Sequence, residues 1–360
     1  MTQLRVGVVY GGRSGEHEVS VTSAGSIFKH IDRGQYEPIA IRIEKDGRWT
    51  LPHQAPLAVP AAEVIQHARA GQTGGAALGG GDAAVLASLA LDVVFPVLHG
   101  PYGEDGTIQG LLEMANLPYV GPGVLASAAG MDKAVMKVLF AAAGLPLCPW
   151  QGFVRAEWLR ERGRILDAVG ALGLPVFVKP ANLGSSVGIS KVKSAAELAP
   201  AIEHAFEFDR KVVVEAAVPN AREIECGVLG NDDPAASMPG EIIPSREFYD
   251  YEAKYLDDDS TSVIPADLPA ATIAEVQRLS LAAFRAVDAA GLARVDFLLA
   301  RDTGALVLNE INTMPGFTTI SMYPKMWEAS GVAYPALIDR LIQLGLERFA
   351  QKQRLKTSVV

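Results

Sequence analysis

The segment Leu4-Arg-Val-Gly-Val-Val-Tyr-Gly-Gly-Arg-Ser-Gly-Glu16 decides the fold of this chain. Its first seven residues are a β-rich apolar run, the glycines that follow mark a turn, and a helical pattern then continues to about Asp32. A second strand near Tyr36 to Ile43 gives a βαβ start, which favours a parallel sheet with helices on its faces. The sequence therefore predicts an α/β chain whose N-terminal part is a doubly wound parallel sheet.

The composition limits what the protein does. At 360 residues the chain is long enough for two or three domains, each with its own core. The net charge of −9 argues against nonspecific binding of nucleic acid, because that binding depends on lysine and arginine neutralising phosphates. Residues Met1 to Tyr10 resemble neither a signal peptide nor a membrane anchor, so we expect a cytoplasmic protein without a membrane partner. Cys148 and Cys226 lack metal-site spacing, which predicts two buried free thiols.

Glycine and proline divide the remaining chain. An Ala, Gly and Pro-rich stretch at about 52–82 predicts a surface insertion. Gly121-Pro-Gly123 is the first plausible domain boundary, and a long helix is expected after it, up to Gly144. The pattern beyond it alternates further strands and helices, and helices are expected at about 158–172 and 270–290.

Two strands near the C-terminal end carry a polar cluster. The turn Asp302-Thr-Gly304 predicts that the strands around Asp296 and Glu310 pair as an antiparallel hairpin. Glu310 and Asn312 then share a face, and the register can bring Asp296 onto it. Oxygen ligands of this kind suit Mg²⁺ bound together with substrate phosphates. A polar strand end with solvated carboxylates is the alternative.

Two further segments could meet phosphate or an amino group. Lys179 ends an apolar strand, and the backbone N–H groups of Gly184 to Val187 could cradle phosphate beside it. No Walker motif is present, and an exposed lysine before a flexible turn is the alternative. Glu16, where the first loop becomes a helix, could receive a substrate ammonium group or merely complement the helix dipole. The loop does not spell a dinucleotide fingerprint.

Taken together, these pieces resemble the ATP-grasp superfamily and, within it, the D-alanine:D-alanine ligase family. The matching segments stand in the family's order and span nearly the whole chain. They are Gly11-Gly-Arg-Ser-Gly-Glu-His-Glu-Val-Ser20, His99-Gly-Pro-Tyr-Gly-Glu-Asp-Gly106, Met131-Asp-Lys133, Lys179-Pro180, Gly184-Ser-Ser-Val-Gly188, Tyr249-Asp-Tyr-Glu-Ala-Lys-Tyr255, Arg294-Val-Asp296 and Asn309-Glu-Ile-Asn-Thr-Met-Pro-Gly316.

The resemblance implies a three-domain ATP-grasp fold with domains at 1–121, 122–215 and 216–360, and a lid at about 247–262. It implies that ATP phosphorylates the carboxylate of one D-alanine, and that the amine of a second attacks the acylphosphate to give D-alanyl-D-alanine for peptidoglycan. ATP as co-substrate, two Mg²⁺ or Mn²⁺ ions and a homodimer are implied with it. A D-lactate or D-serine acceptor, and a catalytically silent ATP-binding regulator, are the alternatives.

The resemblance also implies a role for individual residues of this sequence. Those implied in catalysis are Glu16, Ser185, Tyr255, Arg294 and Gly316. Those implied at the second substrate are His99, Ser321 and Met322. Those implied in ATP binding are Lys133, Lys179, Glu215, Ala216, Val218, Glu223 and Lys254, and the implied metal ligands are Asp296, Glu310 and Asn312.

Two positions bear on how these roles are read. Tyr255 in the lid favours an amine as second substrate, since relatives that make the ester often have a nonhydroxylated aromatic residue there. For His99 a structural role after a strand remains as open as a role near the second substrate.

Overall fold

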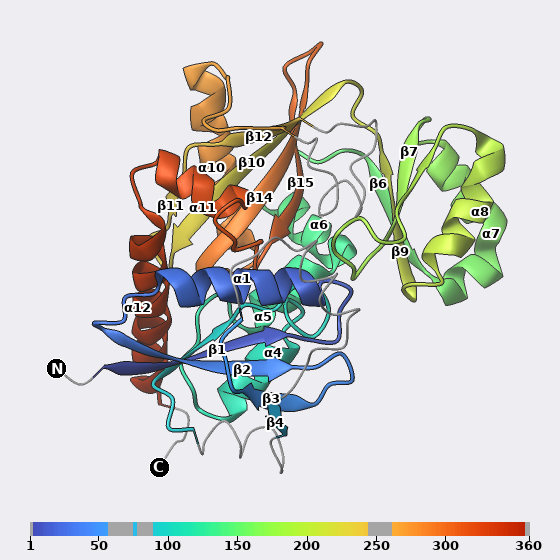
Figure 1. The fold of residues 1–360 in the computed structure, drawn as a ribbon. Coiled ribbons are helices and arrows are strands. Elements are labelled where there is room, and N and C mark those ends of the chain that lie inside the picture. Colours follow the sequence, from blue (N-terminus) through green and yellow to red (C-terminus); the bar gives the residue numbers. More distant parts are fainter. Residues whose placement is uncertain (1–2, 57–74, 78–88, 244–260, 357–360) are drawn as a thin grey trace.

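The computed structural model describes residues 3–56, 75–77, 89–243 and 261–356, and its strands form three sheets (Figure 1). Most of the predicted lid, including Lys254 and Tyr255, lies outside the described residues, as does most of the predicted insertion, while the last lid residues, 261 and 262, belong to a strand. Within that insertion, Gly75–Ala77 is a short strand. No helix in the described ranges has the length and apolar character needed to cross a membrane.

The N-terminal sheet has the order β4-β3-β2-β1-β5. Its strands are β1 (Leu4–Gly11), β2 (Tyr36–Ile43), β3 (Trp49–Pro52), β4 (Gly75–Ala77) and β5 (Val93–Pro96). Strand β1 pairs in parallel with both β2 and β5, as the βαβ pattern predicts, while β3 and β4 add an antiparallel edge.

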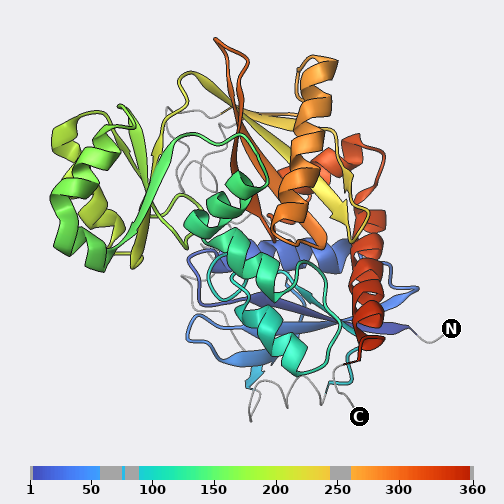
Figure 2. The same cartoon turned by 180° about the vertical axis from the view of Figure 1, so that it is seen from behind.

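Helices cover both faces of this sheet because successive side chains of β1 point to opposite sides. Val6 and Val8 pack against helices α1 (His17–His30) and α12 (Tyr334–Gln353). Val9 belongs to a second core with α4 (Thr107–Met114). The sheet is therefore doubly wound, and α12 carries the C-terminal end of the chain back onto it (Figure 2).

The four-stranded sheet has the order β6-β9-β7-β8 and lies to one side of the molecule (Figure 1). Its strands are β6 (Trp150–Val154), β7 (Val176–Pro180), β8 (Ser190–Val192) and β9 (Lys211–Ala216). Helices α7 (Arg155–Gly170) and α8 (Ala195–Ala205) cover one face, where Val176, Val178 and Val214 are buried. The opposite face of this sheet is not covered by α7 or α8 and faces a pocket.

The largest sheet has the order β13-β12-β10-β14-β15, with β11 paired to β10. Its strands are β10 (Ala221–Gly230), β11 (Ala235–Ala236), β12 (Gly240–Ile243), β13 (Thr261–Val263), β14 (Gly291–Ala300) and β15 (Leu306–Asn312). Helix α10 (Ala270–Ala286) covers one face together with α6 (Lys133–Ala142), and α11 (Met322–Ala329) contacts β10. Both cysteines are buried and free, as expected.

The long helix expected after Gly123 is divided. Helix α5 (Val124–Met131) stops at Asp132, whose backbone is extended, and α6 begins with Lys133. The Asp132 carboxylate accepts hydrogen bonds from the first N–H groups of α6, so it caps a new helix instead of continuing the old one. The three domain limits implied by the resemblance stay a prediction, since α5 and α6 contribute side chains to the core of the largest sheet while α6 also contacts β9 of the sheet that follows.

Candidate active site

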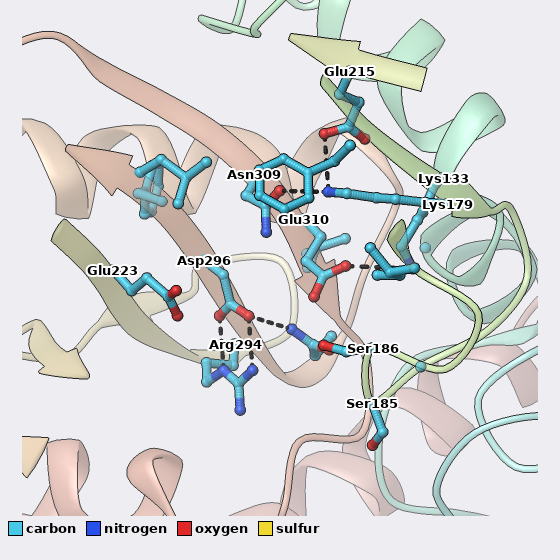
Figure 3. A pocket seen from close by; sticks show the side chains of 18 of the residues that line it. Lys133, Lys179, Ser185, Ser186, Glu215, Glu223, Arg294, Asp296, Asn309 and Glu310 are labelled. Carbon is cyan, nitrogen blue, oxygen red and sulfur yellow. Dashed lines mark hydrogen bonds and ion pairs between the residues drawn. The ribbon is translucent and has the colours of Figure 1, made fainter. Parts of the chain in front are cut away.

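A pocket lies between the four-stranded sheet and the largest sheet. On the four-stranded side, alternation turns Val176, Val178 and Val214 into the core and leaves Phe177, Lys179 and Glu215 on the pocket face. Ala216 and Glu223 also line the pocket, and Figure 3 shows Lys179, Glu215 and Glu223 around it.

The hairpin β14–β15 forms the other wall. The two strands are antiparallel, as the sequence predicts, and their register sets Arg294 opposite Asn312 and Asp296 opposite Glu310. A β-bulge follows, because Phe297 pairs with Leu308 and leaves Asn309 without a partner in the ladder. The bulge brings Asn309 into the pocket lining beside Glu310, although consecutive residues of a regular strand point to opposite faces.

Arg294 and Asp296 form the closest charged contact in this wall. The Nε and Nη2 atoms of Arg294 each donate to one oxygen of Asp296, both at 2.7 Å. The Asn312 amide donates to the same carboxylate at 2.8 Å. Burial by itself lowers the pKa of Arg294, but Asp296, Glu225 and Glu310 raise it well above its ordinary value. Arg294 therefore keeps its positive charge in a buried site.

Lys179 and Glu215 form a buried ion pair on the opposite wall. The Lys179 ammonium donates to Glu215 at 3.0 Å and to the Asn309 side-chain oxygen at 3.3 Å (Figure 3). Lys137 of α6 approaches the other oxygen of Glu215 at 3.3 Å and is itself buried. Burial raises the pKa of Glu215, but the two lysines lower it more, so this carboxylate is ionised.

Lys133 owes its position to the break between α5 and α6. Its ammonium donates to the Leu183 carbonyl at 2.8 Å and lies 3.4 Å from Glu310. It therefore connects the glycine and serine loop at 181–188 to the hairpin. Lys133, Lys179 and Arg294 together supply three positive charges along one pocket.

Glu16 reaches this region from the N-terminal sheet. It is buried at the start of α1, where its side chain makes no helix cap, and its carboxylate accepts a hydrogen bond from the Ser185 hydroxyl. Gly100 allows the approach, since a Cβ at this residue, whose φ is +72°, would lie 2.6 Å from a Glu16 oxygen. The structure thus joins two residues separated by most of the N-terminal half of the chain.

His99 and Glu104 connect the N-terminal loop to the segment after β15. One ring nitrogen of His99 lies 2.9 Å from the Met314 carbonyl, and the other lies 3.1 Å from the Ser23 hydroxyl. Burial lowers the pKa of His99, so the ring is neutral near pH 7. Glu104 accepts from the Gly100 and Met314 N–H groups, and burial followed by the Glu16 charge raises its pKa to about 8. These contacts favour the structural role of His99, in which the ring joins the loop after β5 to the segment after β15.

The remaining predicted residues lie away from the pocket lining. Ser321 is the N-cap residue of α11, and its hydroxyl receives a hydrogen bond from the Thr318 N–H at 3.1 Å. That hydroxyl sits beside Gly316, and Met322 packs inward at the start of α11. Val218 follows β9 and is partly buried.

The predicted metal ligands fit a hard cation by their chemistry. They offer two carboxylates and one amide oxygen on neighbouring strands, and such a set leaves positions for phosphate oxygens and water. Among the described residues, no three His, Cys, Asp or Glu side chains converge on a single metal position. An ion here would therefore depend on oxygens from the nucleotide.

Solved structures share the whole architecture. A D-alanine-D-alanine ligase from Coxiella burnetii matches with a TM-score of 0.82 at 38% identity, covering 98% of this chain and 97% of its own. The D-Ala:D-Ser ligase VanG from Enterococcus faecalis matches equally well, with 0.82 at 33% identity, covering 96% of this chain and all of its own.

Sequence comparisons give the same result along the full length. The D-ala D-ala ligase N-terminus family matches residues 5–122, and the corresponding C-terminus family matches 139–343. A D-alanine--D-alanine ligase from Heliobacterium modesticaldum is 50% identical, covering 99% of this chain and 98% of its own. The chain belongs to the D-alanine–D-alanine ligase family. A second relative, the D-alanine--D-alanine ligase from Bacillus cytotoxicus, is 48% identical over the full length of both chains. The chain is therefore an ATP-dependent ligase with the ATP-grasp fold that its motifs predict.

Sequence reasoning missed four residues that contact this site, namely Glu104, Lys137, Glu225 and Asn309. Glu104 and Asn309 stand inside quoted family motifs, so those motifs were a usable signal for both. Lys137 lies four residues after Lys133 on the same helix, which is a spacing that places both side chains on one face. Only the pairing of β10 with β14 could have identified Glu225.

Proposed function

We propose that this chain joins two D-alanine molecules at the pocket described above, with phosphorylation of the first carboxylate by ATP as the opening step. The γ-phosphoryl group of ATP passes to that carboxylate, which releases ADP. The amine of the second D-alanine attacks the acylphosphate carbon, loses a proton and expels phosphate as the peptide bond forms. The hydrogen bond between Ser185 and Glu16 supports this proposal, because it holds a carboxylate, the group that would bind a substrate ammonium, beside a residue that lines the pocket.

The charges of the two walls suit the two substrates. Lys133 and Lys179 would neutralise the ATP phosphates, and Glu215, Ala216, Val218 and Glu223 would hold adenine and ribose, with Lys254 reaching the phosphates from the lid. Asp296, Glu310 and Asn312 would hold two Mg²⁺ or Mn²⁺ ions, which would neutralise charge on the transferring phosphoryl group. A buried setting strengthens each of these interactions.

The other residues would act on the amino acids. Arg294 would stabilise charge on the reacting carboxylate and on the tetrahedral oxyanion, with help from the Gly316 N–H. Glu16 would bind the first ammonium group, ordered by Ser185 and Tyr255. Ser321 and the Met322 backbone would receive the second carboxylate, with His99 nearby.

The wider setting follows from this reaction. We propose that its dipeptide product serves peptidoglycan synthesis, that the reaction takes place in the cytoplasm, where ATP is supplied, and that the ligase acts as a homodimer. The division into domains at 1–121, 122–215 and 216–360 is part of the same proposal. Tyr255 remains the residue to which we assign the preference for an amine acceptor.

Acceptor choice needs a direct measurement, because the D-Ala:D-Ser ligase VanG shares the fold just as closely. Turnover with ATP, Mg²⁺ and D-alanine, followed by phosphate release and product mass, should exceed turnover when D-serine or D-lactate is the second substrate. Faster formation of the serine dipeptide or the lactate ester would contradict the proposal. Absence of phosphate release with every acceptor would instead favour a silent nucleotide-binding protein.

The oxyanion role can be tested separately. Arg294→Ala should lose about 10²- to 10³-fold in kcat, because loss of one oxyanion donor in an enclosed site costs that much. ATP binding, measured by calorimetry, should persist in the same variant. An active Arg294→Ala enzyme would remove Arg294 from the reaction.

A further inference from the structure

A second acidic side chain, on the strand next to β14, contacts the same arginine. Glu225 of β10 lies directly opposite Asp296 in the antiparallel ladder, and its carboxylate is 3.0 Å from Nε of Arg294. The residue opposite Arg294 itself is Gly227, which has no side chain. Glu225 is two residues from Gly227 on the same face of β10. It is therefore the nearest β10 side chain on this face that the guanidinium can reach.

The two carboxylates hold Arg294 in different ways. Asp296 contacts both Nε and Nη2, whereas the ion pair with Glu225 joins its carboxylate to Nε. All three side chains are largely buried, with 18% of Arg294, 10% of Glu225 and 13% of Asp296 exposed. Figure 3 shows the guanidinium turned toward Asp296, with its third nitrogen pointing away.

The proposed reaction asks two things of Asp296 at once. As a cation ligand, its oxygens must turn to the metal, yet in this structure they are taken by Arg294 and by the Asn312 amide. A buried arginine that lost its only carboxylate would be strongly destabilised. Some other group must then keep Arg294 where the oxyanion forms.

Glu225 meets this need without serving the cation itself. Glu225, Asp296 and Glu310 form one cross-strand row, but within the described residues no three acidic side chains converge on a single metal position. We propose that Glu225 is a positioning residue that retains Arg294 in the site when Asp296 turns to a divalent cation. This rests on the proposed function, since it assigns Asp296 to the cation and Arg294 to the oxyanion.

The change of carboxylate partner can be measured on the Arg294 side chain. We would record the side-chain Nε–H signal of Arg294 in ¹⁵N-arginine-labelled protein, assigned with Arg294→Lys, alone and with ADP plus Mg²⁺. In the wild type the signal should remain protected from solvent exchange in both states. In Glu225→Gln it should be protected in the free protein, where Asp296 holds it, and should lose protection on adding ADP with Mg²⁺ but not ADP alone.

Kinetics supply a second measurement. Glu225→Gln should lower kcat by about 10²-fold, as a displaced catalytic group does, with a smaller change in KM for ATP. In an Arg294→Lys background the same change should have less than a threefold effect, because the group it positions is gone. Glu241→Gln is the matched control. It removes the carboxylate partner of Arg222, a buried Arg–Glu pair on the opposite face of β10, and should leave kcat unchanged.

Several results would overturn the inference. They are a protected Nε–H signal in Glu225→Gln with ADP and Mg²⁺, loss of protection in the wild type, and a full 10²-fold effect of Glu225→Gln in the Arg294→Lys background. If the wild type formed no dipeptide, the proposed function would fail, but the exchange measurement would still report whether Glu225 holds Arg294.

Discussion

Replacing Lys137 by methionine tests the buried charge cluster beneath the nucleotide pocket. The Lys137 side chain is 1% exposed, and its ammonium lies 3.3 Å from Oε1 of Glu215, while Lys179 holds the other oxygen at 3.0 Å. Methionine keeps an unbranched apolar stem of similar length but has no charge. The change therefore removes one of two cations from a single buried carboxylate.

The expected loss of stability follows from these distances. At an effective dielectric constant of about 20, two unit charges at this separation attract by about 5 kcal/mol. Burying the lysine costs several kcal/mol, and methionine avoids that cost. Removing one partner of an isolated buried pair typically destabilises by about 3–5 kcal/mol. Because Glu215 keeps Lys179, we expect a loss of about 2 kcal/mol in the free energy of unfolding.

The stability of the variant should also depend less on pH in the acid range. The folded-state pKa of Glu215 lies below its ordinary value of 4.5, so its stabilising contribution is present above pH 4.5 and is lost as the pH falls through the folded-state pKa. Without Lys137 the folded-state pKa rises. Because the gap between the folded-state and unfolded-state pKa is then smaller, the variant should lose less unfolding free energy on acidification than the wild type.

Urea unfolding at pH 7 and at a series of lower pH values, followed by tryptophan fluorescence, measures these effects. Lys352→Met is the control, since it removes a lysine from a half-exposed surface pair with Glu113 and should change stability by less than about 1 kcal/mol. A Lys137→Met protein within about 0.5 kcal/mol of the wild type at pH 7, with the same loss of unfolding free energy on acidification, would refute the assigned role of the pair.

Three further outcomes follow from single contacts. Gly345→Ala should lower the unfolding free energy by about 1–3 kcal/mol, because the new Cβ would lie 2.7 Å from a backbone oxygen outside its helix. Gly163→Ala is the control, since a Cβ there meets nothing within 4 Å. Urea unfolding of both variants measures the difference, and equal stabilities would contradict the prediction. Ser185→Ala should lower kcat/KM for D-alanine by roughly 10- to 100-fold, because it removes a hydrogen bond to the Glu16 carboxylate. The KM for ATP should stay nearly unchanged in steady-state kinetics. A change confined to the KM for ATP would count against a role of Ser185 at the amino acid. Asp296→Asn should raise the Mg²⁺ concentration needed for half-maximal turnover, as measured by titration with Mg²⁺ at fixed ATP, and an unchanged requirement would remove Asp296 from the ligand set.

Local patterns in the sequence were enough for much of the fold. The βαβ start was confirmed by the parallel pairing of β1 with β2, and the turn at Asp302 by the β14–β15 hairpin. The long helix expected up to Gly144 was wrong, since Asp132 caps a new helix. That competition between a cap and a continuing helix is settled by contacts of the capping side chain, which a periodic pattern does not contain.

Part of the site was also within reach of the sequence. Alternation along β15 placed Glu310 and Asn312 on one face, and the ladder put Asp296 beside them. Asn309 escaped this reasoning because a bulge depends on how two strands accommodate each other. The roles assigned to Lys254 and Tyr255 stay predictions, since both lie outside the described residues.

By itself, the sequence determined the family, the order of the elements and the kinds of side chain available for the reaction, because these are carried by motifs and by spacing within single segments. Which distant residues meet in ion pairs and hydrogen bonds depended on the tertiary structure. It set Glu16 against Ser185, Lys137 against Glu215 and Glu225 against Arg294. The physical reason is that a buried ion needs a partner within a few ångströms, and folding of separate segments chooses that partner.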